Sequence, residues 1–167
     1  MLQSETAPNC TADQYEHALA PWQKAITAGN CAFENQSFYR ARDHYQSALY
    51  LVSNLIAHFT HQYDRQLQEE ALMHCCPALV VAAHNLADCY LAMALPHKAC
   101  EQLIAVHQQL AQLGDHANPQ VGLIAMRHGM RTRTELMHFI ANHQAHKNLV
   151  SWATQTLNTP HSAHPYH

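Results

Sequence analysis

Two stretches of the chain decide its fold. The first is Ala25-x-x-Ala28-Gly29-x-x-Ala32 with Ala41-x-x-x-Tyr45-x-x-Ala48, and the second is Ala83-x-x-Leu86-Ala87-x-x-Tyr90 with Ala99-x-x-x-Leu103-x-x-Val106. Small residues recur at intervals of three or four, so they share one face of a helix. Small side chains on that face let two antiparallel helices approach closely, while the larger side chains fill the remaining space. Each stretch is therefore predicted to be a pair of packed helices.

The two stretches resemble the tetratricopeptide repeat, whose signature is W-x-x-L-G-x-x-Y followed by A-x-x-x-F. The resemblance covers residues 22–55 and 80–111. It implies an all-α fold, a right-handed superhelix of antiparallel helix pairs with six or seven helices. It also implies a concave, helix-lined groove that binds a peptide or a partner protein without catalysis. A generic antiparallel helical bundle is the alternative fold.

Composition agrees with helices throughout, because the chain has only four glycines and no β-branched runs. We expect a flexible tail over residues 1–12, a helical domain over 13–158 and a flexible His-rich tail over 159–167. In the first pair, Ser37 is a plausible N-cap for the second helix.

The spacing of the two stretches predicts an insertion. Ala41 and Ala99 occupy matching positions 58 residues apart (99 − 41), whereas the family period is about 34 residues. Residues 38–76 could form one helix, which would be about 58 Å long. Alternatively, the first helix ends near 60–63 and Asp64 caps a returning helix, kinked or interrupted at Pro77. We predict the hairpin, with its insert at about 56–79, because each apolar face then covers the other.

A further pair of helices is expected over residues 119–158. Gly114 is placed as the C-cap of the preceding helix, and Asn118-Pro119 is an N-cap followed by proline at the first helical position. The last helix spans about 144–157. The apolar stripe of the first helix of this pair consists of Leu123, Met126, Met130, Met137 and Ile140.

Charge and hydropathy narrow the class of protein. The net charge of −3 provides no basic field for nucleic acid. Uninterrupted apolar runs such as Ala78 to Ala83 are far shorter than the roughly 20 residues of a membrane helix. No secretory signal is visible at the start, so we expect a cytoplasmic protein that binds neither nucleic acid nor membrane, with reduced cysteines.

Sixteen histidines and six cysteines make metal binding the main alternative function. Several His and Cys pairs lie three residues apart on one helix face, but no C-x-x-C pair exists and nothing marks four ligands as one site. We therefore expect no metal and no cofactor. The weak candidates for zinc, copper or nickel ligands are His74, Cys75, Cys76, His97, Cys100, His161, His164 and His167.

The common catalytic motifs are absent from the sequence, so we expect no enzyme activity. The third function considered is self-association of the helices into a homo-oligomer.

The resemblance also implies a binding site. Some tetratricopeptide domains hold a partner's terminal carboxylate with asparagines and basic side chains. Asn30 and Asn85 match the asparagine positions, and Arg127 and Arg131 have the i,i+4 spacing of the basic pair. Arginine's planar fork suits a carboxylate. These four residues are predicted to line one concave face and to receive an acidic peptide. Arg127 and Arg131, with Arg133, also lie among the methionines of the same helix, which is the composition of an adaptable binding surface.

Overall fold

The computed structural model describes residues 10–160, with side chains from Tyr15 onward. These residues form six α-helices and no strand, so the expectation of an all-α protein is confirmed. The helices are α1 (Cys10–Glu34), α2 (Phe38–Thr60), α3 (Arg65–Ala92), α4 (Pro96–Gly114), α5 (Pro119–Asn142) and α6 (Lys147–Asn158).

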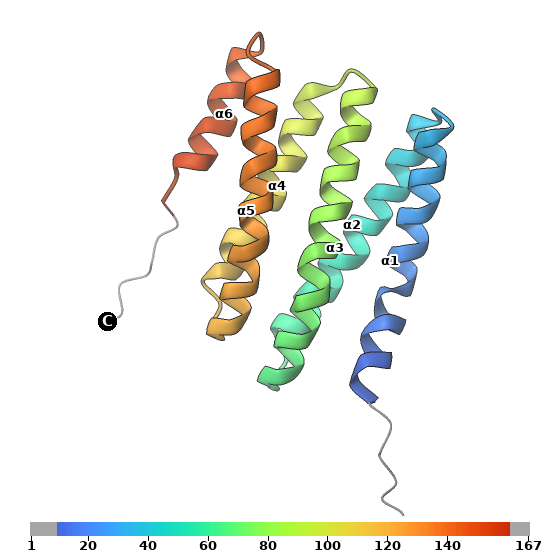
Figure 1. Cartoon of the computed structure of the whole chain (residues 1–167), viewed down its shortest axis with the longest axis vertical. Helices are drawn as coiled ribbons and strands as arrows, with labels where there is room; N and C mark the ends of the chain where they lie inside the picture. The colour runs from blue at the N-terminus through green and yellow to red at the C-terminus, as the bar shows by residue number, and fades with distance from the viewer. Residues whose placement is uncertain (1–9, 161–167) are drawn as a thin grey trace, which may run out of the picture.

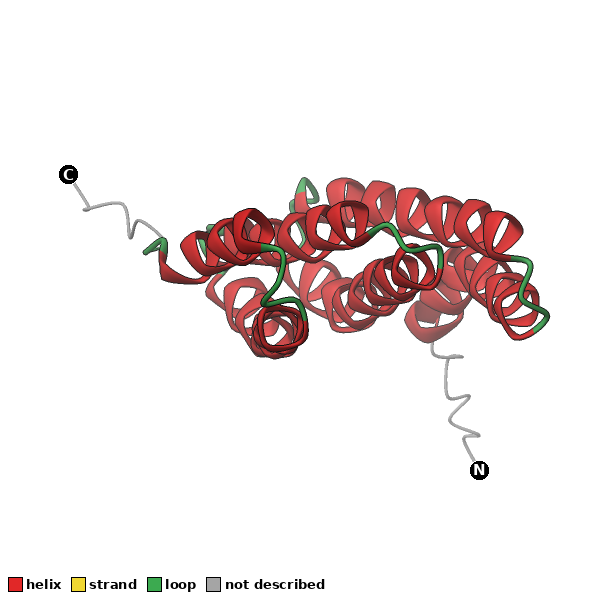
Figure 2. Ribbon diagram, turned by 90° about the horizontal axis from the view of Figure 1, so that it is seen from above, coloured by secondary structure: helices red, strands yellow, loops and turns green. Residues whose placement is uncertain are grey.

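The helices form two layers. α1, α3 and α5 lie side by side in one layer, and α2, α4 and α6 lie in the other (Figures 1 and 2). Each helix packs against the next one in the chain. Within the first layer α3 also contacts both α1 and α5, whereas α2 and α4, both fully described, do not approach each other.

The predicted hairpin is confirmed. α2 ends at Thr60, and the side chain of Asp64 caps α3 by accepting a hydrogen bond from the backbone N–H of Leu67 at 3.2 Å. The prediction that the returning helix is interrupted at Pro77 is wrong, because α3 continues through this residue. Residues on both sides of Pro77 are buried, including Cys76 and Ala78. Their burial offsets the loss of about 3 kcal/mol that proline causes inside a helix.

α3 is the central helix of the array. It contacts α1, α2, α4 and α5. By length and composition it is also apolar enough to cross a membrane, which the short run from Ala78 to Ala83 did not reveal. In this structure 61% of its most apolar window is buried among the other helices, as in the core helix of a packed domain.

The first helix pair crosses as closely as its small residues predict. A Cβ atom placed on Gly29 would lie 2.5 Å from Cε1 of Tyr45, so the tyrosine ring packs directly on the α1 backbone. Ala41 and Ala48 are fully buried on α2. A larger side chain at these three positions would force the helices apart.

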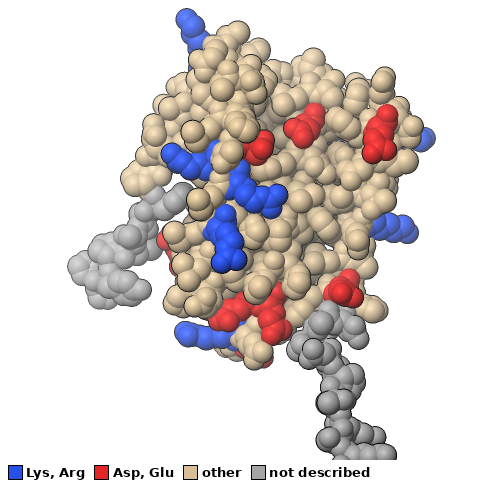
Figure 3. Space-filling view, viewed as in Figure 1, with Lys and Arg blue, Asp and Glu red and all other residues tan. Residues whose placement is uncertain are grey.

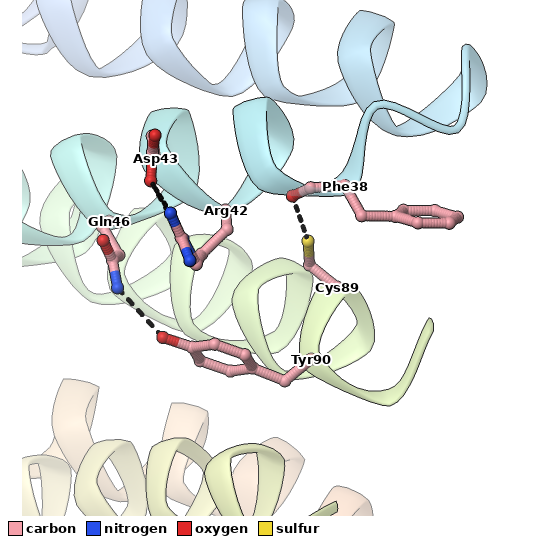
Figure 4. A network of polar contacts seen from close by, with 6 residues as sticks. All are labelled: Phe38, Arg42, Asp43, Gln46, Cys89 and Tyr90. Carbon is pink, nitrogen blue, oxygen red and sulfur yellow. Dashed lines mark hydrogen bonds and ion pairs between the residues drawn. The ribbon is translucent and has the colours of Figure 1, made fainter. Parts of the chain in front are cut away.

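Polar contacts add to the packing between α2 and α3 (Figure 4). Gln46 donates a hydrogen bond to the Tyr90 hydroxyl at 2.9 Å, and the Cys89 thiol donates to the Phe38 carbonyl at 3.2 Å. Cys89 is buried and behaves as a small apolar residue with a weak S–H donor. The five cysteines whose side chains are described are all free.

Several predicted boundaries need correction. α1 begins at Cys10, so the last residues of the expected tail at 1–12 are helical, and α6 begins at Lys147 rather than near 144. Gly114 is the last residue of α4 and Asp115 is its C-cap, while Ser37 holds the N-cap position without a side-chain hydrogen bond. The remainder of both expected tails, residues 1–9 and 161–167, lies outside the described residues.

The start of α5 follows the prediction, but its inward face does not. Asn118 caps the helix by accepting a hydrogen bond from the N–H of Gln120 at 3.1 Å, and Pro119 follows it. The residues that α5 buries are Val121, Gly122, Ala125, Thr132, Leu136 and Phe139. Four members of the predicted stripe are exposed, namely Leu123, Met126, Met130 and Met137. In the first turns of α5 the small residues Gly122 and Ala125 face inward because α4 approaches closely: a Cβ atom on Gly122 would lie 2.7 Å from the Gly114 carbonyl oxygen.

The two glycines of α5 provide a matched test of this close approach. Gly129 has open space where a Cβ atom would be, so Gly129→Ala should raise the free energy of unfolding by about 0.5–1 kcal/mol through helix propensity. Gly122→Ala meets a backbone carbonyl and should instead lower it by about 1–3 kcal/mol. Chemical denaturation measures both. Equal effects of the two substitutions would contradict the proposed α4–α5 crossing.

The helix pair α1–α2 allows a second test. Ala41→Leu should overpack the buried crossing and cost about 1–3 kcal/mol, which lowers the melting temperature by several degrees. Ala57→Leu is the control on the same helix, because Ala57 is exposed and should tolerate the larger side chain. Thermal unfolding followed by circular dichroism distinguishes the two, and an unchanged melting temperature for Ala41→Leu would refute the close crossing.

Candidate functional site

Asn30 of α1 and Asn85 of α3 meet in the structure. The Oδ1 atom of Asn30 accepts two hydrogen bonds, from the Tyr45 hydroxyl at 2.8 Å and from Nδ2 of Asn85 at 3.3 Å. Burial raises the pKa of Tyr45 to about 12, so its hydroxyl keeps the proton that it donates. The close approach at Gly29 brings this tyrosine from α2 into the gap between α1 and α3.

A hollow of about 190 Å³ surrounds the two asparagines. It is lined by Asn30, Phe33, Glu34, Tyr45, Asn85 and Asp88. Two of these residues are acidic. Burial raises the pKa of Asp88, and the charge of Glu135 on α5 raises it further. The hollow is therefore suited to amide and cationic groups rather than to a carboxylate.

Arg127 and Arg131 lie exposed on α5. Arg131 is close enough to α3 to lower the pKa of His84, and both arginines lower that of the neighbouring His128. Figure 3 shows basic side chains gathered over α5 on the face formed by α1, α3 and α5, with acidic side chains over both the upper and the lower parts of the same face. The structure thus joins the asparagines directly, while the arginines form a separate basic patch on the next helix of the layer.

Asp88 and Glu135, the acidic residues near the asparagine pair and the arginines, were not identified from the sequence. Asp88 follows Asn85 by three residues and His84 by four, a spacing that places all three on neighbouring positions of one helix surface. This spacing was the available signal. The proximity of Glu135 could not be found in this way, because it depends on the packing of α5 against α3.

His84 of α3 and His128 of α5 are half-buried histidines. The Nε2 atom of His84 and the Nδ1 atom of His128 are buried and have no hydrogen-bond partner. Burial lowers the pKa of both rings, the charge of Arg131 lowers it further, and Glu135 partly opposes this at His84. Both imidazoles are therefore neutral at neutral pH.

The candidate metal ligands are not brought together. His74 is exposed and stacks on the Tyr15 ring, with centroids 6.0 Å apart, and His97 lies beside Trp152. Burial raises the pKa of Cys75 and Cys76 to about 12 and that of Cys100 to about 11, so these thiols stay protonated. Among the described residues, no group of three or more His, Cys, Asp or Glu side chains could hold an ion. His161, His164 and His167 lie outside those residues.

The chain matches a family described as protein of unknown function (DUF2753) over residues 20–165. No curated protein and no solved structure matches it. The match extends from within α1 through α6, so it includes every helix that contributes to the site.

The two half-buried histidines predict a pH dependence of stability. Their folded pKa values lie below the ordinary value of 6.5, so the unfolded chain binds protons more readily. Stability should therefore fall as the pH drops from about 7.5 to about 5.5. His84→Gln with His128→Gln should flatten this part of the curve of melting temperature against pH.

The matched control replaces two exposed histidines, His58→Gln with His138→Gln, and should leave the pH dependence in place. An unchanged slope in the His84/His128 variant would show that these rings do not titrate as described.

Proposed function

We propose a function for this chain, which belongs to the family of unknown function DUF2753: it is a non-catalytic module that binds a segment of a partner protein across α1, α3 and α5. Under this proposal the six helices are three pairs of a tetratricopeptide-like superhelix. The contacts between helices support the arrangement, since α3 contacts α1 and α5 while α2 and α4 stay apart. An array whose first layer is the tighter one curves toward that layer, which makes α1, α3 and α5 the concave side.

The observation that carries the proposal is the hydrogen bond between Asn30 and Asn85 beside an open hollow. Two asparagines from different helices place amide groups at the surface. Oδ1 of Asn30 is occupied by Tyr45 and Asn85, which leaves the NH2 group of Asn30 as a donor and Oδ1 of Asn85 as an acceptor for the backbone of an extended or helical segment. Neither side chain belongs to the apolar core.

Charge refines the choice of partner. Arg127 and Arg131 can form charged hydrogen bonds with a carboxylate. Glu34 and Asp88 at the hollow, with Glu135 beside Asp88, disfavour a carboxylate there. The proposed partner segment is therefore acidic where it crosses α5, and amide-bearing or basic where it crosses α1 and α3.

The environment of four of the six cysteines disfavours catalysis by those thiols. A nucleophilic cysteine needs a lowered pKa, whereas burial raises the pKa of Cys75, Cys76, Cys89 and Cys100.

Site-specific photo-crosslinking in extracts of the native cell tests the binding face. A photoreactive residue replaces Thr27, which is exposed one turn before Asn30, and in the control it replaces Tyr50, which is exposed on α2. We expect a discrete crosslinked protein from position 27 and none from position 50. Arg131→Glu should reduce the yield about tenfold, because a charged hydrogen bond contributes about 1.5–3 kcal/mol. Equal crosslinking from both positions, or a yield insensitive to Arg131→Glu, would contradict the proposal.

A further inference from the structure

The helical array ends in a helix that is shorter than the two helices it covers. α6 has 12 residues, whereas α4 has 19 and α5 has 24. At 1.5 Å per residue these lengths are about 18, 28 and 36 Å. Figure 1 shows α6 beside the upper half of α5 only, with the end of α4 beside the lower half.

A groove occupies the space that α6 does not reach. It has a volume of about 450 Å³ and lies between α4 and α5, next to the end of α6. Its apolar lining includes Leu110, Ala111, Ala125, Met126, Met130 and Leu157. The groove lies at the edge of the array, between the two layers, and shares no lining residue with the hollow at Asn30 and Asn85.

The side of α5 that borders this groove has the spacing of a coiled-coil seam. Leu123, Met126, Met130, Arg133, Met137 and Ile140 follow one another at alternating intervals of three and four residues. Such a heptad pattern is the one by which a helix packs against another helix. The exposed fractions of its apolar side chains are 57% for Leu123, 62% for Met126, 71% for Met130 and 53% for Met137. The seam is thus formed, and its apolar members from Leu123 to Met137 are each more than half exposed, whereas Ile140 packs against the core.

Gly129 shows that the seam is accessible at its centre. It lines the groove, and a Cβ atom placed on it would meet no atom within 4 Å. The backbone of α5 is therefore open to a side chain from outside the described array. Methionines on both sides of the glycine are flexible and adapt to the shape of an incoming surface.

The charges around the seam are mainly positive. α5 carries three arginines and one glutamate, a formal charge of +3 − 1 = +2 in a chain whose net charge is −3. By helical spacing Arg127 adjoins Leu123 and Met130, and Arg133 adjoins Met130 and Met137. Arg133 also donates to the Leu157 carbonyl at the end of α6 at 3.3 Å. The acid lining the groove is Asp115, at the far end of α4.

These charges disfavour a second copy of the chain as the occupant. In an antiparallel pairing of two α5 helices centred on Met130, Arg127 of one copy would lie beside Arg133 of the other. Arg127 flanks the seam and Arg133 is a member of it, so this pairing brings like charges together at the interface, which is destabilising. Acidic side chains in the same positions would instead form interhelical ion pairs, as at the edges of coiled coils.

We propose that the α4–α5 groove and the seam on α5 bind an amphipathic helix of a partner protein, with an apolar stripe flanked by acidic residues. The uncovered length of α5, about 18 Å, accommodates about three turns of such a helix. The partner's apolar stripe packs on Met126, Met130 and Met137, and its carboxylates pair with Arg127 and Arg133. The groove is separate from the hollow at Asn30 and Asn85. Arg127 lies between the concave face and the seam, so both proposed surfaces share that arginine.

A designed peptide tests the surface without knowledge of the natural partner. The probe is a fluorescent three-heptad helix with Leu at both seam positions and Glu at both flanking positions. The control peptide has Lys in place of Glu, so each peptide repels its own copies equally. Fluorescence anisotropy with the full chain should show the Glu peptide binding at least tenfold more tightly than the Lys peptide, with the difference shrinking at high salt.

Three variants then locate the binding site. Gly129→Leu fills open space and Met130→Glu alters an exposed side chain, so both variants should keep the fold. Both should weaken the binding of the Glu peptide at least tenfold. Arg127→Glu should reduce or reverse the preference for Glu over Lys. Tyr50→Glu, an exposed position on α2, is the control and should leave the affinity unchanged. Circular dichroism of each variant verifies its helicity.

Other outcomes would overturn the proposal. Equal binding of both peptides, or binding unaffected by Gly129→Leu and Met130→Glu, would remove the seam as the site. A dimer in sedimentation that Met130→Glu dissociates would assign the seam to a second copy. Binding that appears only after removal of residues 161–167 would assign the groove to the chain's own C-terminal segment.

Discussion

The burial of α3 is the constraint on which the rest of the structure depends. This helix contacts four of the other five, and its apolar residues link the two core clusters. A helix that is apolar on nearly all sides must be surrounded, which places α2 and α4 behind it and α1 and α5 beside it. After Pro77 the polar residues of α3 are confined to the narrow strip that remains, and His84, Asn85 and Asp88 lie there. The candidate site therefore lies where these polar residues of α3 remain accessible at the surface.

Small residues decide how closely the surrounding helices approach. Gly29 admits the ring of Tyr45, and through it the hydrogen bond that positions Asn30. Gly122 admits the end of α4, which turns the small face of α5 inward. The methionines of α5 are displaced to the outside by the same contact. Close packing at one face and an adaptable apolar surface at the other are therefore two consequences of one helix crossing.

Charge is scarce in this chain, at 13% of residues, so its placement is informative. Glu34 and Asp88 border the hollow, with Glu135 acting on Asp88 across the α3–α5 boundary, while Arg127 and Arg131 lie exposed on α5. Such separation gives a bound segment a direction, because its acidic and basic ends have different optimal positions. His84 of α3, which lies within the influence of Arg131 and Glu135 of α5, and His128 of α5 are half-buried and neutral at neutral pH. Their protonation as the pH falls lowers the stability of the fold near neutrality.

The sequence by itself determined the all-helical class, the hairpin between α2 and α3, the caps at Asp64 and Asn118, and the close crossing at Gly29, Ala41 and Ala48. All of these features depend on residues that are near one another in the chain, so their spacing predicts the local helix geometry directly. Only the tertiary structure decided which face of α5 is buried. Helical periodicity finds an apolar stripe and a small-residue stripe on that helix equally well, and the choice between them depends on how near α4 comes. The same holds for Glu135 beside Asp88 and for the groove left by the short α6. Each is created by helices that are distant in sequence, so no local pattern records it.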